Sequence, residues 1–199
     1  MAKLLYSVTM SADGFIAGPN GDMQWMRPYL GPNPEVDELI PRIGSILVGR
    51  RSHDGDDPHK GEPGEGEAFG GGWDGPLFVV THRPPSTPEP GVTYVDQLPK
   101  AIAAAKAAAG DKYVNVIGAD IARQCIAAGE LDEVLLIVAP VFLGDGTRVF
   151  DEPGGQTVRL RARSTTAGTN LWFDVLELSG RAHDRADLDV PALDGGVGQ

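Results

Sequence analysis

Residues 92–128 read VTYVDQLPKAIAAAKAAAGDKYVNVIGADIARQCIAA, and this stretch decides the fold class. Residues 92–95 form a short β-rich run, and the alanine-rich residues 98–109 that follow predict a helix. A second strand and a second helix are predicted over residues 113–118 and 120–128. Strands that alternate with crossover helices form parallel sheets with helices on their faces. The pattern therefore predicts an α/β protein.

The segments before this stretch continue the alternation. A short helix is predicted over residues 35–43, beginning at Asn33 or Pro34. Three runs rich in apolar and β-branched residues predict strands over residues 4–8, 45–49 and 77–81.

The segments after it complete the sheet. Residues 133–143 are apolar at almost every position and are interrupted by Pro140. Alternating apolar positions in residues 158–164 and 171–178 predict an antiparallel hairpin that turns at residues 167–168. We expect a mixed, mostly parallel sheet flanked by helices, with a C-terminal antiparallel hairpin at one edge.

The composition restricts the class of protein. At 199 residues, 41% of them hydrophobic, the chain fits one domain with a substantial core. The single cysteine, Cys125, allows no internal disulfide and suits a reducing compartment. We find no signal-peptide layout and no apolar run of the roughly 18 residues that a membrane helix needs, so we expect a cytoplasmic protein without a membrane partner. The net charge of −11 argues against a nucleic-acid partner, and no metal-ligand spacing stands out around His53 and His59.

Two segments lie outside the alternating pattern. Residues 54–76 are rich in glycine, proline and acidic residues and are too long for a simple connection, which is typical of lids or disordered loops. Residues 180–199 are polar, rich in aspartate, and typical of a tail. We therefore expect one domain over residues 1–179, followed by this tail.

Basic residues follow two of the predicted strands. Gly49-Arg50-Arg51-Ser52 comes after one strand, and Thr81-His82-Arg83 comes after another. Ligands of open parallel sheets bind beyond the carboxyl ends of the strands, and arginine matches phosphate oxygens two at a time. Either cluster alone could be a solvated turn, but two such clusters in an acidic chain favour a phosphate-bearing ligand.

Glycines mark two further strand ends. At Gly118 a strand turns sharply into a helix, whose unpaired N–H groups suit a pyrophosphate, although the same sequence would also make an ordinary tight turn. Residues 11–18 contain Gly14 and Gly18, which allow a loop to fold closely over a planar ligand. Trp25 could close that loop or could belong to the core.

Together these segments resemble the dihydrofolate-reductase superfamily, in the branch that includes the reductase domain of the riboflavin-pathway deaminase-reductase. The resemblance covers about residues 3–178, and the deaminase half with its zinc ligands is absent. Its most specific part is the last of five stretches: SADGFIA at 11–17, GRRS at 49–52, FVVTHRP at 78–84, VIGADIAR at 116–123 and LDEVLLIVAPVFLGDGTRVF at 131–150.

The resemblance implies that NADPH lies across the carboxyl edge of the sheet. It places the nicotinamide beside Ala17 and Gly18, phosphates on Gly49, Arg50, Arg51 and Ser52, the adenosine 2′-phosphate between Thr81, His82 and Arg83, and the pyrophosphate and ribose over Gly118, Ala119, Asp120 and Ile121. Two departures bear on it. The family usually has Gly-Gly where this chain has Gly118-Ala119, and residues 54–76 replace a segment that usually begins with a helix, so the substrate does not carry over.

The implied activity is NADPH-dependent reduction of a small heterocycle by a homodimer, with residues 133–143 as the expected pairing surface. For the acid we consider Asp37 in the helix before the Gly-Arg turn and Asp13 in the first loop, with Glu35 as a neighbour of the first. Each has an alternative: Glu35 and Asp37 suit a helix's first turn, and Asp13 suits a turn. The competing function is a non-catalytic module that binds NADPH or another nucleotide.

Overall fold

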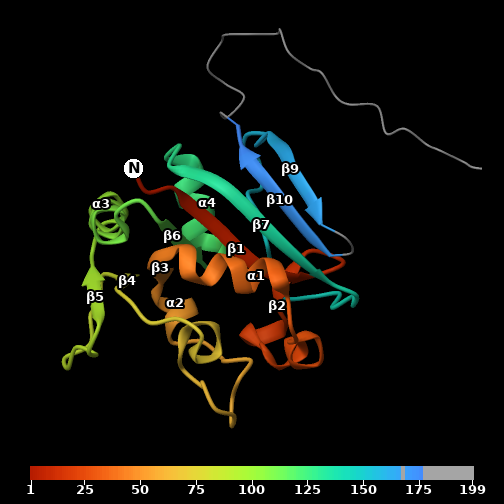
Figure 1. Cartoon of the computed structure of the whole chain (residues 1–199), viewed down its shortest axis with the longest axis horizontal. Coiled ribbons are helices and arrows are strands. Elements are labelled where there is room, and N and C mark those ends of the chain that lie inside the picture. Colours follow the sequence, from red (N-terminus) through yellow and green to blue (C-terminus); the bar gives the residue numbers. More distant parts are fainter. Residues whose placement is uncertain (167–168, 177–199) are drawn as a thin grey trace, which may run out of the picture.

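The computed structural model describes residues 1–166 and 169–176, with a mixed β-sheet at its centre (Figure 1). Among these residues eight strands form the sheet, in the order β5-β4-β3-β6-β1-β7-β10-β9. Neighbouring strands are parallel from β5 to β7, whereas β10 is antiparallel to both of its neighbours, β7 and β9. The strands are β1 (Leu4–Ser11), β3 (Ile43–Gly49), β4 (Leu77–Val80), β5 (Val92–Val95), β6 (Tyr113–Ile117), β7 (Leu131–Ala139), β9 (Leu160–Thr166) and β10 (Asn170–Val175). The expected fold class is confirmed.

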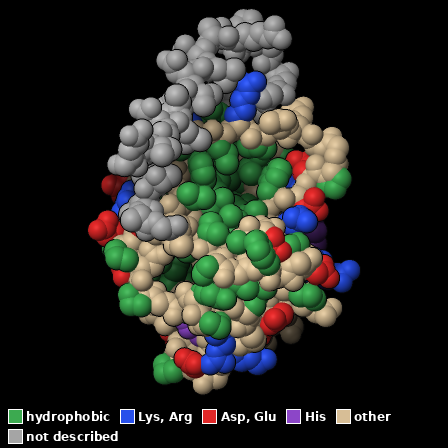
Figure 2. All heavy atoms as spheres, turned by 90° about the vertical axis from the view of Figure 1, so that its right-hand side faces the viewer, with side chains coloured by type: hydrophobic (Ala, Val, Ile, Leu, Met, Phe, Trp, Pro, Cys, Tyr) green, Lys and Arg blue, Asp and Glu red, His purple; other side chains and the backbone are tan. Residues whose placement is uncertain are grey.

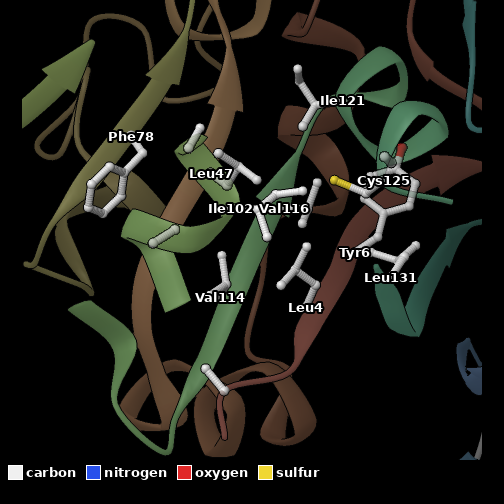
Figure 3. Packing of buried hydrophobic residues seen from close by; sticks show 14 of the residues in the cluster. Leu4, Tyr6, Leu47, Phe78, Ile102, Val114, Val116, Ile121, Cys125 and Leu131 are labelled. Atoms are coloured by element: carbon white, nitrogen blue, oxygen red, sulfur yellow. The ribbon is translucent and has the colours of Figure 1, made fainter. Parts of the chain in front are cut away.

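Two long helices cover one face of this sheet. Helix α3 (Leu98–Ala109) packs on β3, β4 and β6, and α4 (Ala119–Ala127) packs on β6, β3 and β7. Figure 3 shows the resulting core, in which Leu47, Val114 and Val116 of the strands meet Ile102 of α3 and Ile121 of α4. Burial of such large aliphatic side chains stabilises a fold by about 1.5–3 kcal/mol each.

Shorter elements cover the other face. Helix α1 (Pro34–Leu39) inserts Leu39 into a second core, which the segment after residue 53 covers with Ala68, Phe69 and Trp73. Trp73 also donates a hydrogen bond from Nε1 to the carbonyl of Ile43, at 3.1 Å. The remaining elements are α2 (Arg50–His53), the antiparallel pair β2 (Phe15–Ala17) and β8 (Thr147–Arg148), and the 3-10 turns η1 (Pro19–Gly21), η2 (Gln24–Tyr29), η3 (Ile40–Arg42) and η4 (Ala68–Gly71).

Residues 54–76 form a folded cover and not the open loop that their composition suggests. Asp56 accepts hydrogen bonds from the backbone N–H of Met23, at 3.0 Å, and from Nε2 of Gln24, at 2.9 Å. Arg27 forms an ion pair with Glu62. The acidic residues of this segment therefore bind the N–H groups and cations of residues 23–27.

Several predicted boundaries need correction. The helix predicted over residues 35–43 ends at Leu39, because Pro41 lacks the N–H that a continuing α-helix requires and a 3-10 turn follows. The apolar run 133–143 contains strand β7 only as far as Ala139, before Pro140. Its successive side chains join the two cores in turn, Val134 and Leu136 on one face and Leu135 and Ile137 on the other, so packing on both faces explains its apolar character. The predicted turn at residues 167–168, the end of the strand predicted to residue 178, and the tail lie outside the described residues.

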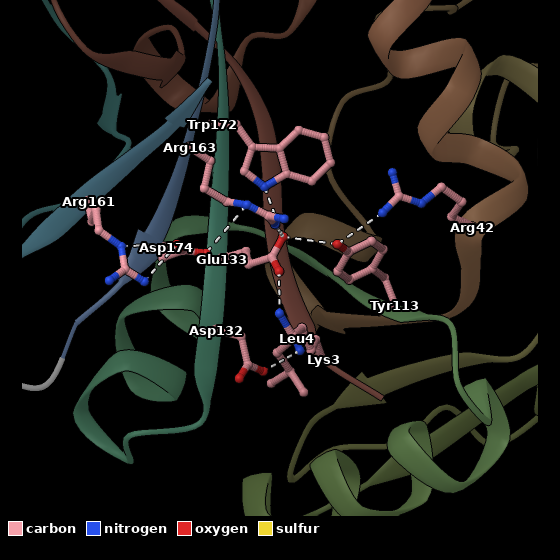
Figure 4. Close-up of polar contacts among 10 residues, drawn as sticks. All are labelled: Lys3, Leu4, Arg42, Tyr113, Asp132, Glu133, Arg161, Arg163, Trp172 and Asp174. Atoms are coloured by element: carbon pink, nitrogen blue, oxygen red, sulfur yellow. Dashed lines mark hydrogen bonds and ion pairs between the residues drawn. The ribbon is translucent and has the colours of Figure 1, made fainter. Parts of the chain in front are cut away.

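A buried carboxylate connects the amino ends of β1, β6 and β7 with residues of β10 and β9 (Figure 4). Glu133 of β7 is fully buried and accepts hydrogen bonds from Nζ of Lys3, at 2.8 Å, the hydroxyl of Tyr113, at 3.0 Å, and Nε1 of Trp172, at 2.9 Å. Arg163 of β9 lies 2.5 Å away as a second cation. Burial acts to raise the pKa of Glu133, but the hydrogen bonds from Lys3, Tyr113 and Trp172 outweigh it and hold this pKa below its ordinary value.

No helix among the described residues is long and apolar enough to cross a membrane.

Candidate cofactor-binding edge

The parallel strands bring the predicted binding segments to one edge of the sheet. Gly49 ends β3, Thr81 follows β4 and Gly118 follows β6. Because β3 lies between β4 and β6, the three segments are neighbours at the carboxyl edge. This is the place where ligands of open α/β sheets bind.

Two of these segments touch each other directly. Gly118 has φ +97°, and a Cβ at this position would lie 2.3 Å from Oγ of Ser52. A Cβ at Gly49 would likewise lie 2.9 Å from Cγ1 of Ile121. The Gly-Arg turn after β3 and the turn into α4 therefore form one continuous surface, whose close backbone approach depends on both glycines.

The turn into α4 tolerates the alanine that replaces the family's second glycine. Ala119 is the first residue of α4, and it is not among the non-glycine residues of the described chain that have positive φ. Its backbone therefore carries no positive-φ strain. Asp120 is exposed and accepts hydrogen bonds from Nη2 of Arg123, at 2.9 Å, and Nε2 of Gln124, at 2.8 Å. Its side chain therefore binds residues of the next helical turn and does not cap the helix.

Arg50 is held by its neighbours at the start of α2. Its Nε donates to Asp54, and its guanidinium carbon lies 5.7 Å from the centre of the Tyr94 ring on β5. Its Nη1 is buried without a hydrogen-bond partner among the described residues. Hydrogen bonding by His53, together with Arg50, holds the pKa of Asp54 below its ordinary value. Arg50 is thus a fixed cation with one donor still open.

The remaining predicted phosphate-binding residues lie on the surface. Arg51, Ser52, His82 and Arg83 are exposed, whereas Thr81 is buried and accepts a hydrogen bond from the backbone N–H of Arg83, at 3.0 Å. The Thr81 hydroxyl therefore shapes the turn that carries Arg83.

Asp13 ties the first loop to the segment after β7. Its carboxylate accepts hydrogen bonds from the hydroxyl of Ser11, at 2.5 Å, and from the N–H groups of Leu143, at 3.1 Å, and Gly144, at 2.7 Å. The Ser11 hydrogen bond, followed by those from Gly144 and Leu143, lowers the pKa of Asp13 to about 2. The carboxylate is therefore ionised near neutral pH, and these contacts suit a loop anchor better than a proton donor.

The other acid candidates are placed differently. Asp37 is exposed in the first turn of α1, and the structure shows no side-chain hydrogen bond for it among the described residues. Glu35, two residues earlier, is partly buried, and its Oε2 is buried without a hydrogen-bond partner in the described part of the chain. Glu35 is therefore the carboxyl of α1 that has an unused buried acceptor.

A cavity of about 390 Å³ opens beside the turn into α4. Its wall joins the start of α4 to the segment after β7, and Ala17 and Gly18 lie next to it through β2, which pairs with β8. The lining residues are Phe15, Ala119, Asp120, Arg123, Gly144, Asp145, Gly146, Thr147, Arg148 and Asp151. The volume is of the size of a small-molecule site.

Some residues of this edge were not found from the sequence. Asp54 stands four residues after Arg50, a spacing at which side chains meet on a helix, but no helix was predicted at this position. Tyr94 and Glu89 could not have been found, since their approach to Arg50 and His53 depends on the pairing of β5 with β4.

Comparison with known proteins identifies the family. The model of the RibD C-terminal domain matches residues 2–172. The chain belongs to this family. This chain is also 23% identical over 171 residues to the uncharacterized protein YwjB of Bacillus subtilis, and the match covers 82% of this chain and 90% of that protein. The family expected from the sequence motifs is confirmed.

Solved structures confirm the fold. A putative riboflavin biosynthesis protein from Shewanella sp. PV-4 superposes with a TM-score of 0.67 at 20% identity, over 89% of this chain and all of that one. The Saccharomyces riboflavin biosynthesis reductase Rib7 gives a TM-score of 0.54 at 18% identity, over 90% and 89%. The Thermotoga maritima deaminase/reductase gives 0.58 at 16% identity over 87% of this chain, which spans 56% of that longer protein. The fold is therefore that of riboflavin-pathway reductases.

Proposed function

We propose that this RibD C-terminal domain protein is an NADPH-dependent reductase of a small heterocyclic substrate, similar to the pyrimidine reductase of the riboflavin pathway. The observation that carries the proposal is the contact between Gly118 and Ser52, which joins the two turns into one backbone surface at the sheet's carboxyl edge. N–H groups at a helix start beside a fixed arginine suit a pyrophosphate.

The nicotinamide would then lie towards Ala17 and Gly18, beside the cavity of about 390 Å³. The cofactor supplies the hydride, and the protein positions the acceptor carbon. Of the acid candidates, Asp13 is occupied as a loop anchor and Asp37 is exposed. Water therefore supplies the proton in this proposal, with Asp37 kept as the alternative donor.

Arg83 and His82 would select NADPH over NADH. Both are exposed beside the end of β4, and NADPH differs from NADH by one 2′-phosphate. A charge-assisted hydrogen bond contributes about 1.5–3 kcal/mol, or roughly 10- to 150-fold in affinity. Arg83→Ala should weaken NADPH by about this factor and leave NADH nearly unchanged, whereas Arg50→Ala should weaken both if Arg50 holds the shared pyrophosphate.

The test measures both dissociation constants for each variant by fluorescence titration, and NADPH oxidation with pterins, pyrimidine ribityl compounds and quinones. Turnover of a ribityl pyrimidine supports the reductase. Tight NADPH binding without turnover of any of the three classes supports the non-catalytic binding module, and equal losses for both cofactors on Arg83→Ala refute the placement of the 2′-phosphate.

We also propose a homodimer in the cytoplasm. Figure 2 shows hydrophobic side chains gathered on the side of the molecule that carries the C-terminal hairpin. The register pairs Leu136 with Leu171 and Leu160 with Val175, so these side chains share one sheet face, and Leu160 is 43% exposed. Large exposed apolar patches mark interaction sites. Light scattering should give twice the 21.0 kDa of the chain, and a stable monomer at micromolar concentration refutes the pairing.

A further inference from the structure

One carboxylate bridges two basic side chains of α2. The Oδ2 atom of Asp54 accepts a hydrogen bond from Nε of Arg50, and its Oδ1 atom lies 2.9 Å from Nδ1 of His53. Asp54 is the residue that ends α2, so the anion and both of its partners belong to the same short turn after β3. The guanidinium that the proposed function assigns to a cofactor phosphate therefore already carries an anion.

The rest of the Arg50 guanidinium can bind a second anion, or a ligand anion can replace Asp54. The Tyr94 ring supports it at 5.7 Å, and Nη1 has no hydrogen-bond partner among the described residues. Nη1 itself is buried, but the Arg50 side chain as a whole is 35% exposed, so a ligand can reach the guanidinium. Carboxylate and phosphate oxygens accept from the same guanidinium donors, so Asp54 and a phosphate compete for Arg50.

His53 faces two carboxylates and one aromatic ring. Besides Asp54 on its own turn, its Nε2 lies 3.7 Å from Oε2 of Glu89, in the segment before β5. The Tyr94 ring meets it edge-on, with centroids 6.1 Å apart, and the Tyr94 hydroxyl donates to Glu89 at 2.5 Å. The imidazole therefore contacts the carboxylate oxygen of Asp54 that Arg50 does not contact.

We propose that Asp54 is an internal competitor that a cofactor phosphate displaces from Arg50, and that His53 retains the displaced Asp54 and so strengthens phosphate binding. The inference rests on the proposed function, because it takes Arg50 as a phosphate ligand, and it adds the residues that set the affinity. Removal of the Asp54 carboxylate should then strengthen phosphate binding, and removal of the His53 imidazole should weaken it.

The charge of the ligand has to stay constant in the test. The 2′-phosphate of NADPH gains its second charge near about pH 6, whereas ADP-ribose carries only a pyrophosphate diester, which does not titrate near neutral pH. Both ligands are therefore titrated calorimetrically at about pH 8, well above the phosphate pKa.

The variants are Asp54→Asn and His53→Gln, with Asp111→Asn as a matched control that removes one negative charge from the exposed turn at the opposite end of β6. Thermal melts establish that each is folded. Removal of an exposed ion pair such as Arg50–Asp54 should change the affinity for the ligand about two- to fivefold. At about pH 8 we expect Asp54→Asn to bind ADP-ribose tighter than wild type by that factor, with Asp111→Asn unchanged and His53→Gln binding it more weakly.

The outcomes separate the two proposals. Equal or weaker ADP-ribose binding by Asp54→Asn overturns the competition, and equal or tighter binding by His53→Gln overturns the role of His53. Tighter binding by Asp54→Asn without reductase turnover overturns the proposed function and leaves the competition standing. If no variant binds either ligand, both proposals are wrong.

Discussion

Replacing Gly118 by alanine tests whether the contact between the two turns is as close as the structure indicates. Two effects add at this position. The backbone φ of +97° is unfavourable for an L-residue, and the new Cβ would lie 2.3 Å from Oγ of Ser52. Because Ser52 begins its side chain 3.2 Å from the same point, rotating its hydroxyl removes only part of the overlap.

The magnitude follows from these two terms. A positive φ costs an alanine about 1–2 kcal/mol, and overpacking of this kind costs about 1–3 kcal/mol. We expect a loss of roughly 2–5 kcal/mol in the free energy of unfolding. At about 2–4 °C per kcal/mol for a chain of this size, the melting temperature should fall by roughly 5–15 °C.

Gly129→Ala is the matched control, because Gly129 has φ +70° and nothing within 4 Å of an added Cβ. It should cost only the backbone part, about 1–2 kcal/mol. Combining Gly118→Ala with Ser52→Ala should restore part of the lost stability, since the hydroxyl is the closest atom. Equal melting temperatures for Gly118→Ala and Gly129→Ala, with no recovery in the double variant, would refute the close approach of the two turns.

Three further predictions concern ionisable groups. Glu133→Gln should cost about 2–4 kcal/mol, because it leaves Lys3 and Arg163 without their buried counter-ion. Because folding lowers the pKa of Glu133, this carboxylate stabilises the folded state above its ordinary pKa of about 4.3, and the stabilisation is lost as pH falls through the lowered value. The free energy of unfolding should therefore fall less steeply with decreasing pH in Glu133→Gln than in wild type. Equal slopes would contradict this. Burial raises the pKa of the Cys125 thiol to about 12, so native protein should resist alkylation by iodoacetamide at about pH 8, and rapid native labelling would show the thiol is accessible. Asp13, with a pKa of about 2, should contribute no step to the rate profile above about pH 4, and Asp13→Asn should leave the shape of that profile unchanged while lowering its height.

The regular part of the fold was predictable because each strand and helix carries its own pattern. Residues 98–109 are helical as expected, and Gly110 ends that helix with φ +67°. Capping was less predictable. Asp96 does not cap α3 but lies 3.9 Å from Lys100, and the amide of Asn33 at the start of α1 bonds to Asn170 from β10. In both cases a distant or alternative partner takes the side chain that local rules assign to the helix.

The candidate site was likewise predictable only in part. The strand ends Gly49, Thr81 and Gly118 follow from the parallel topology, and the contact of Gly118 with Ser52 agrees with that placement. The roles of single side chains did not follow, because they depend on contacts across the chain. Asp13 meets N–H groups some 130 residues away, and residues 54–76 are ordered by contacts with residues 23–27. No local pattern in a sequence encodes such distant contacts.

The position of β1 has a consequence for synthesis of the protein on the ribosome. This first strand lies at the middle of the sheet, where Leu4 is opposite Val114 of β6 on one side and Leu131 of β7 on the other. At about 5–20 residues per second, the nascent chain carries an unpaired apolar strand for roughly 5–25 seconds before both neighbours have been made. A chain that stops before residue 131 would leave one side of β1 open as a sheet edge, so premature termination should yield aggregating fragments and not a smaller folded domain.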